Sequence, residues 1–64
     1  MIDIAIMNAG SIVVLSGTTV KGQEWLSEHM PEDCQRWGMN GYVVEPRYLH
    51  DIVIGITDDG LEVE

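Results

Sequence analysis

The chain has 64 residues, with eleven Asp and Glu residues against three Lys and Arg residues, and its formal net charge at pH 7 is -8. This length predicts one small domain, residues 1–64, which buries only about 60% of the surface of its unfolded chain. The charge argues against direct binding to nucleic acid or to an anionic membrane, because both would repel it. The apolar fraction of 45% is typical of a folded domain rather than of a disordered acidic tail.

The first elements expected along the chain are two β-strands. Ile2, Ile4 and Ile6 alternate with Asp and Ala, as in a strand that buries one face. Residues 12–15 are apolar at every position and mostly β-branched, which favours a central strand. The Asn-Ala-Gly turn signal at residues 8–10 predicts a hairpin between them, and a single bent strand is the alternative.

Residues 20–30 predict the first helix. The Ser-Gly-Thr-Thr run at residues 16–19 offers a helix cap, and Pro31 ends the helix because the residue before proline avoids helical angles. Residues 31–35 are expected to begin another short turn of helix, and residues 37–41 are expected to form a loop. The helix residues expected to face the core are Trp25, Leu26 and Met30.

The second half of the chain predicts a third strand, a second helix and a short last strand. Residues 42–45 are expected to be the strand, Pro46 to start the helix and Gly60 to end it in a left-handed cap. Residues 61–64 alternate and predict an edge strand. The order β(β)αβαβ predicts a single small α/β (α+β) domain with a three- to four-stranded sheet and two helices. The apolar stripe of the second helix comprises Tyr48, Leu49, Ile52, Val53 and Ile56.

The acidic residues lie at positions that do not favour helix stability. Glu24, Glu28 and Glu32 are four residues apart, which places neighbours on a helix about 6 Å apart along its axis. Pro31 leaves only the first two as secure neighbours, and like charges at this spacing cost a few tenths of a kcal/mol. Both helices also carry acids near their C-terminal ends, which forfeits roughly 0.3–1 kcal/mol at each position.

This placement leads to the hypothesis of an acidic surface that binds a basic protein. Regular carboxylates can stand in for phosphates, and their binding would weaken with salt. Trp37 is interpreted either as a lid over the core or as an anchor for the partner. The alternative is that the acids only keep the protein soluble. The candidate partner-binding residues are Glu24, Glu28, Glu32, Asp33, Asp58, Asp59 and Trp37.

The residues offer little support for catalysis or for a cofactor. Cys34 is the only cysteine, so no internal disulfide is expected, which fits a reducing cytosol. The first residues do not resemble a signal peptide. His29, Cys34 and His50 match no metal-ligand spacing, and we expect no metal and no cofactor. An enzyme is the third hypothesis, and it would need a pocket around these three residues.

Two stretches, residues 25–38 and 43–63, resemble a group of very small proteins of bacterial and phage mobile elements. The first contains the pattern Trp-Leu-Ser-Glu-His-Met-Pro-Glu-Asp, and the second contains Val-Val-Glu-Pro-Arg-Tyr. The resemblance implies a mobile-element setting and transfers no catalytic residue. In size, acidity and simplicity the chain also resembles, in kind, phage anti-CRISPR proteins, including those directed against type I systems.

The leading hypothesis is therefore a non-enzymatic inhibitor of the anti-CRISPR kind, which mimics the charge of nucleic acid. Its expected partner is a basic nucleic-acid-binding protein or a CRISPR effector complex of the Cascade type, whose DNA-binding groove it would block. The alternative is a small antitoxin-like or housekeeping interaction domain that dimerises through edge strands and the apolar residues 12–15. Monomer and homodimer are both compatible with the sequence.

Overall fold

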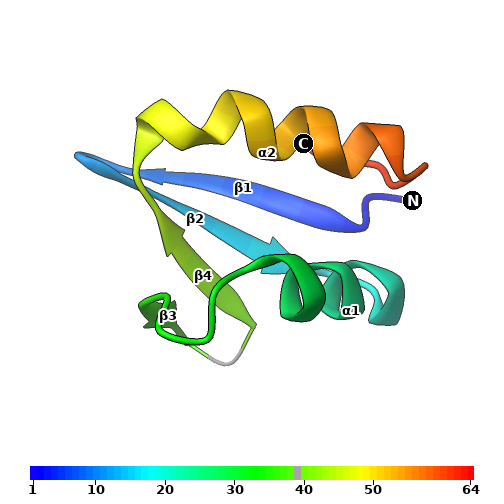
Figure 1. Cartoon of the computed structure of the whole chain (residues 1–64), viewed down its shortest axis with the longest axis horizontal. Helices are drawn as coiled ribbons and strands as arrows, with labels where there is room; N and C mark the ends of the chain where they lie inside the picture. The colour runs from blue at the N-terminus through cyan, green and yellow to red at the C-terminus, as the bar shows by residue number, and fades with distance from the viewer. Residues whose placement is uncertain (39) are drawn as a thin grey trace.

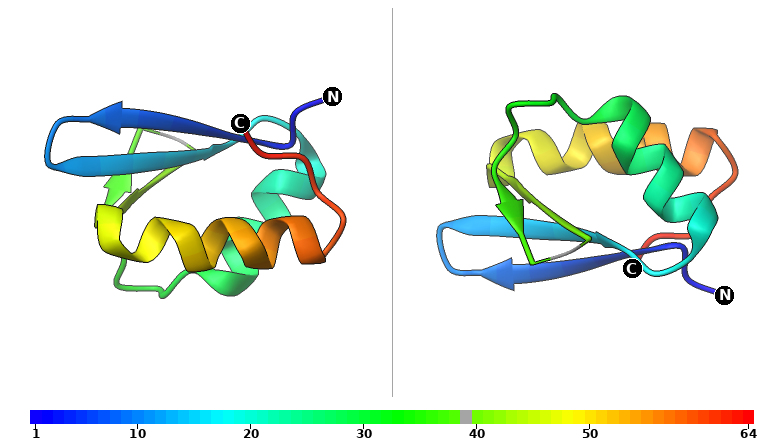
Figure 2. Two further views of the ribbon diagram at one scale, coloured as in Figure 1. Left: turned by 90° about the horizontal axis from the view of Figure 1, so that it is seen from above. Right: turned by 90° about the horizontal axis from the view of Figure 1, so that it is seen from below.

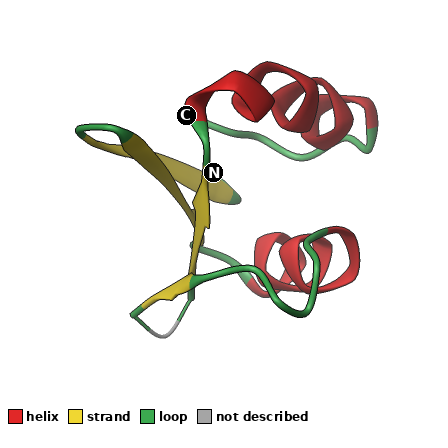
Figure 3. Cartoon of the chain, turned by 60° about the vertical axis from the view of Figure 1, so that its left-hand side comes forward, coloured by secondary structure: helices red, strands yellow, loops and turns green. Residues whose placement is uncertain are grey.

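Four antiparallel strands form one sheet, and two helices lie on one of its faces (Figures 1 and 3). The structure is a computed structural model, and it describes residues 1–38 and 40–64. The strand order across the sheet is β1-β2-β4-β3. The small α+β domain predicted from the sequence is thus confirmed, with the chain order ββαββα. The elements are β1 (Ile4–Ala9), β2 (Ile12–Gly17), α1 (Val20–His29), β3 (Arg36–Trp37), β4 (Gly41–Val44) and α2 (Pro46–Asp58).

The predicted hairpin is correct, and the alternative of a single bent strand is not. Strands β1 and β2 pair along their full length, from Ile4 opposite Gly17 to Ala9 opposite Ile12. Gly10 makes the turn with a φ of 82°, a left-handed angle that favours glycine, and its N–H donates to the side chain of Asn8 at 3.1 Å. Strand β2 lies between β1 and β4, as its apolar sequence predicts.

The core lies between the sheet and the two helices. Because side chains alternate along a strand, every second residue of β1, β2 and β4 faces the helices. The fully buried side chains of this layer come from both the sheet and the helices. They are Ile4, Leu15, Leu26 and Ile56.

Helix α1 begins and ends close to the predicted positions. The hydroxyl of Thr19 caps the helix by accepting from the N–H of Gly22 at 3.0 Å. Met30, before Pro31, is in an extended conformation. The short helical turn predicted for residues 31–35 is wrong: Pro31 starts a turn closed by a hydrogen bond from the Cys34 N–H at 3.1 Å.

The predicted loop, residues 37–41, begins with the last residue of strand β3 and ends with the first residue of β4, so that prediction is wrong in part. Arg36 and Trp37 pair with Tyr42 and Gly41, and the guanidinium of Arg36 lies over the Tyr42 ring at 4.1 Å. Two residues beside glycines carry too little pattern to identify a strand from sequence. The part of this loop at residue 39 lies outside the described residues.

Helix α2 confirms most of the predicted stripe and corrects one residue. Ile56 is buried, and Leu49 and Ile52 pack against the core. Tyr48 is 50% exposed, so this member of the predicted apolar stripe does not lie in the core. It lies in the first turns of α2, where the helix is separated from α1 by an open groove. Gly60 has a φ of 84° and ends the helix, as predicted.

The last residues form only part of the predicted edge strand. Val63 makes a single parallel bridge with Ile4, on the free edge of β1. The N–H groups of Asp3 and Ile4 donate to Glu62 O at 2.9 and 3.1 Å, and the Ile6 N–H donates to Glu64 O at 2.7 Å. The two termini therefore lie side by side, as Figure 2 shows.

Candidate functional site

Asp59 is a predicted binding residue that contacts groups of the protein itself. Its Oδ2 accepts a hydrogen bond of 2.6 Å from the indole Nε1 of Trp25 and lies 3.7 Å from Nε2 of His29. The His29 ring stacks on the Trp25 ring with a centroid separation of 4.0 Å, and its Nδ1 lies 2.8 Å from the Trp25 carbonyl oxygen. The arrangement ties the C-terminal end of α2 to the middle of α1.

Asp3 is a second acid used by the fold, and the sequence analysis did not single it out. One carboxylate oxygen accepts from the Glu62 N–H at 3.0 Å, and the other accepts from the Thr19 hydroxyl at 2.7 Å. Both bonds, the one from Glu62 first, hold the pKa of the Asp3 carboxyl below its ordinary value. Asp3 thus links the start of β1 to the cap of α1 and to the C-terminal segment.

The other five predicted acidic residues are exposed to solvent. None of their side chains takes part in an ion pair within residues 1–38 and 40–64. Glu24 and Glu28 lie one turn apart on α1, Glu32 and Asp33 lie in the turn after Pro31, and Asp58 is the last residue of α2. Because the neighbouring Asp59 contacts α1, the end of α2 adjoins the element that carries Glu24 and Glu28. We call these five residues the solvent acids.

Trp37 lies apart from the solvent acids. Its neighbour Arg36 covers Tyr42 on the helix side of the sheet, so Trp37 points to the opposite face. There it lies opposite Gly41 and is 48% exposed. The same face carries Met7, which is 46% exposed, and the buried Val14. A lid and an anchor both remain predictions for Trp37, and an anchor at this position would be separate from the solvent acids.

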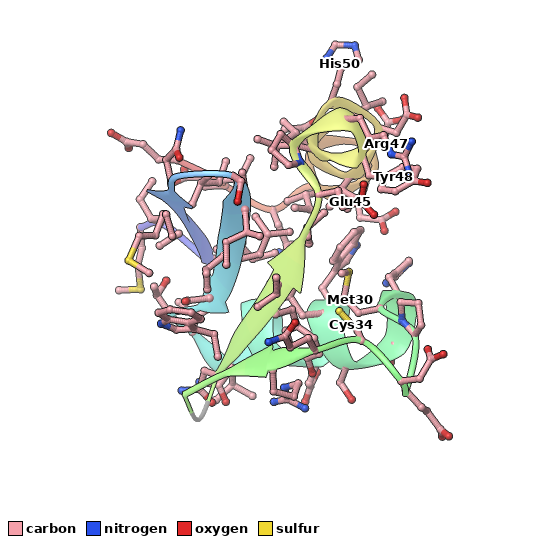
Figure 4. The ribbon with its side chains drawn as sticks, turned by 90° about the vertical axis from the view of Figure 1, so that its left-hand side faces the viewer. Met30, Cys34, Glu45, Arg47, Tyr48 and His50 are labelled. Atoms are coloured by element: carbon pink, nitrogen blue, oxygen red, sulfur yellow. The ribbon has the colours of Figure 1, made fainter. Side chains whose placement is uncertain are left out.

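The described residues form a groove that the sequence analysis missed. It measures about 360 Å³ and lies between the C-terminal end of α1 and the first turns of α2, with β4 as its floor. Figure 4 shows Met30 and Cys34 on one side and Glu45 and Tyr48 on the other, with His50 pointing away. We call it the interhelical groove. Its lining residues are His29, Met30, Pro31, Cys34, Gln35, Val43, Val44, Glu45, Tyr48 and Ile52.

The Cys34 thiol and the two histidines are the residues that bear on whether the groove could support chemistry. The Cys34 thiol is half-buried, packs against the core and donates to the carbonyl oxygen of Val43 at 3.2 Å. Of the three residues proposed for an enzyme, His29 and Cys34 line the groove and His50 does not. In the described part of the chain, no group of three or more His, Cys, Asp or Glu residues is placed to hold a metal ion.

Comparisons with protein-family models, with curated proteins and with solved structures find no match for this chain. In the part of the chain that the structure describes, no helix has the length and apolar character needed to cross a membrane.

Proposed function

We propose that this domain binds a basic surface of a partner protein through its solvent acids, and that it has no catalytic activity of its own. The observation that carries the proposal is that Glu24, Glu28, Glu32, Asp33 and Asp58 are exposed and outside the ion pairs of the described residues. A protein under selection for stability alone gains from neutralising such charges or from moving them to helix N-termini.

The partner class follows from the same carboxylates. A basic groove that receives the phosphates of DNA or RNA also attracts a compact body with a net charge of -8. We therefore propose a nucleic-acid-handling protein of the bacterial cytoplasm, with CRISPR effector complexes of type I as the leading example. Bound there, the domain would exclude DNA from the groove and act as an inhibitor of the anti-CRISPR kind.

A competition experiment tests this function. Labelled duplex target DNA is bound to a purified type I surveillance complex (Cascade), and the domain is titrated in at low and at high salt. We expect displacement of DNA that weakens as salt rises, because the contacts are ionic. DNA occupancy that stays unchanged at the highest protein concentration would contradict the proposal.

Two charge-matched variants make the test specific. The first combines Glu24→Gln, Glu28→Gln and Glu32→Gln on and after α1. The second removes the same number of charges through Asp51→Asn, Glu62→Gln and Glu64→Gln, which lie outside the solvent acids. We expect the first variant to lose most of its competition and the second to keep it. Equal behaviour of the two variants would mean that net charge alone acts, and the proposed surface would be wrong.

A second candidate is an interaction domain that dimerises through the helix-free face of the sheet. The favouring observation is the pair of half-exposed apolar side chains there, Met7 and Trp37. Of residues 12–15, Ile12 and Val14 face that side of the sheet, and only Ile12 is partly exposed there, because Val14 is buried. Light scattering on a sizing column at two salt concentrations distinguishes the candidates. A salt-insensitive dimer that the Trp37→Ser variant converts to a monomer would favour this second function.

A further inference from the structure

The interhelical groove lies beside the place where α1 meets the C-terminal half of α2. The helices meet where the Trp25 indole donates a hydrogen bond to Asp59 and where the Trp25 ring lies beside Gly55. A Cβ added at Gly55 would be in ordinary van der Waals contact with that ring. Toward the start of α2 the space between the helices is open (Figure 4). The fold thus leaves a hollow beside the core at this end.

The walls of the groove are mainly apolar and partly accessible. Met30, Ile52 and Cys34 are half-buried and pack against the core, and Tyr48 is 50% exposed. The volume of about 360 Å³ lies at the lower end of the range of roughly 300–1,000 Å³ that is typical of ligand pockets. Methionine adapts its shape readily, so such walls suit one inserted apolar side chain.

Acidic residues lie on and beside the rim of the groove. Glu45 lines it, Glu32 lines an adjoining hollow that shares Met30 and Pro31 with the groove, and Asp33 lies in the exposed turn between Pro31 and Cys34. Arg47, whose Nε lies 3.0 Å from a Glu45 carboxylate oxygen, compensates one of these three charges. An apolar hollow with a negative rim is complementary to an apolar side chain flanked by Lys or Arg.

The carboxylates at the groove also argue against an anionic ligand or a second copy of this chain as its occupant. An anionic ligand would meet the rim carboxylates, and a second copy of this chain carries a net charge of -8 with only three basic residues. Those three, at positions 21, 36 and 47, do not flank a common apolar side chain. A basic segment of a different protein is the partner that fits both the walls and the rim.

We propose that the interhelical groove receives one apolar anchor side chain of a basic protein segment, whose Lys and Arg residues lie against Glu32, Asp33 and Glu45. This inference rests on the proposed function and deepens it, since it adds an apolar anchor to a surface that would otherwise attract its partner by charge alone. The anchor supplies selectivity among basic partners that the carboxylates alone cannot supply.

Two synthetic peptides of equal charge test the inference by fluorescence anisotropy. One carries Leu between two Lys-Arg pairs, and the other carries Ser at the same place. We expect the Leu peptide to bind roughly tenfold more tightly, because it buries its side chain in the groove. Raising the salt concentration should weaken both peptides alike and leave their ratio unchanged.

Variants of Tyr48 locate the preference. Tyr48→Ala removes part of the wall and should abolish the preference for Leu, whereas Tyr48→Phe should retain it. Ile54→Ala is the matched control, because Ile54 is an α2 residue of similar exposure, 44%, that does not line the groove. Circular dichroism checks that each variant is folded. If Tyr48→Ala is unstable, Tyr48→Phe still tests the inference, because this variant keeps the aromatic wall and must bind both peptides as the wild type does.

The outcomes separate this inference from the proposed function. Equal binding of both peptides to the wild type, or a preference for Leu that survives in Tyr48→Ala, would overturn the groove while the acidic surface stands. Failure of both peptides to bind at low salt would overturn the groove together with attraction to basic segments. Chemical-shift changes confined to residues of the groove on adding the Leu peptide would support the inference directly.

Discussion

The acids of this domain divide into two groups that differ in what surrounds them. Asp3 and Asp59 accept hydrogen bonds from the protein and join elements far apart in the sequence. The solvent acids of α1, of the following turn and of the end of α2 lie outside the ion pairs of the described residues. The comparison teaches that the carboxylates behind the net charge of -8 are not equivalent, because some are hydrogen-bonded within the fold and others are exposed to solvent.

The largest expected effect comes from disturbing the place where the Asp3 segment meets α1. A Cβ at Gly22 would lie 1.9 Å from the carbonyl oxygen of Asp3. In an isolated helix Gly→Ala stabilises by about 1 kcal/mol, but here we expect Gly22→Ala to lower the free energy of unfolding by about 2–3 kcal/mol. Urea denaturation followed by tryptophan fluorescence measures this. A stability equal to or above that of the wild type would show that the segment is not held against α1.

The next effect separates two adjacent carboxylates. Asp59→Ala removes the acceptor of the Trp25 indole, and we expect a loss of about 1–2 kcal/mol in the free energy of unfolding. Asp58→Ala removes the same charge one residue earlier and should stay within about 0.5 kcal/mol of the wild type. The helix dipole acts similarly on both, so the difference reports the hydrogen bond. The assignment of Asp59 to the fold would be contradicted by equal losses in the two variants.

A smaller effect on stability is expected at low pH, through the carboxyl group of Asp3. Since the pKa of Asp3 is lower in the folded state, its contribution to stability is complete above its ordinary value of 3.8 and is lost as the pH falls through the lowered folded-state pKa. Asp3→Asn should therefore be less stable than the wild type at neutral pH, and the gap should narrow below pH 3.8. Thermal denaturation at several pH values measures the gap. A gap of constant size at all pH values would be at odds with this explanation.

The smallest effect belongs to the solvent acids. Glu24 and Glu28 are like charges one helical turn apart, so the variant with Gln at both positions should be more stable by about 0.2–0.5 kcal/mol at low salt. The gain should vanish near 1 M salt, where the Debye length is about 3 Å. Chemical denaturation at the two salt concentrations checks this. A loss of stability at low salt would show that Glu24 and Glu28 stabilise the fold, as Asp3 and Asp59 do.

The sequence predicts the elements well where their signals are local. Thr19, Pro31 and Gly60 mark the helix boundaries, and the alternation in residues 2–6 and the apolar run at residues 12–15 mark the first two strands. Strand β3 escapes prediction because two residues paired to β4 carry no periodicity of their own. Tyr48 fits the helical stripe but lies beyond the reach of α1, and only the crossing of the helices determines that.

The candidate site was predictable only in part for the same reason. Composition and spacing identify the acids, but the division between the two groups depends on contacts across long sequence separations, such as the one between Trp25 and Asp59. The interhelical groove depends on where the helices diverge, which no local pattern records.

The C-terminal segment has a consequence for the behaviour of the protein in concentrated solution. Residues 62–64 occupy hydrogen-bonding groups on the outer edge of β1, which would otherwise be open to a strand from another molecule. Two of these three residues are glutamates, and their charge discourages further strand addition. Removing them would leave the Ile-rich edge of β1 open to strand addition, so we expect such a variant to form fibrils more readily.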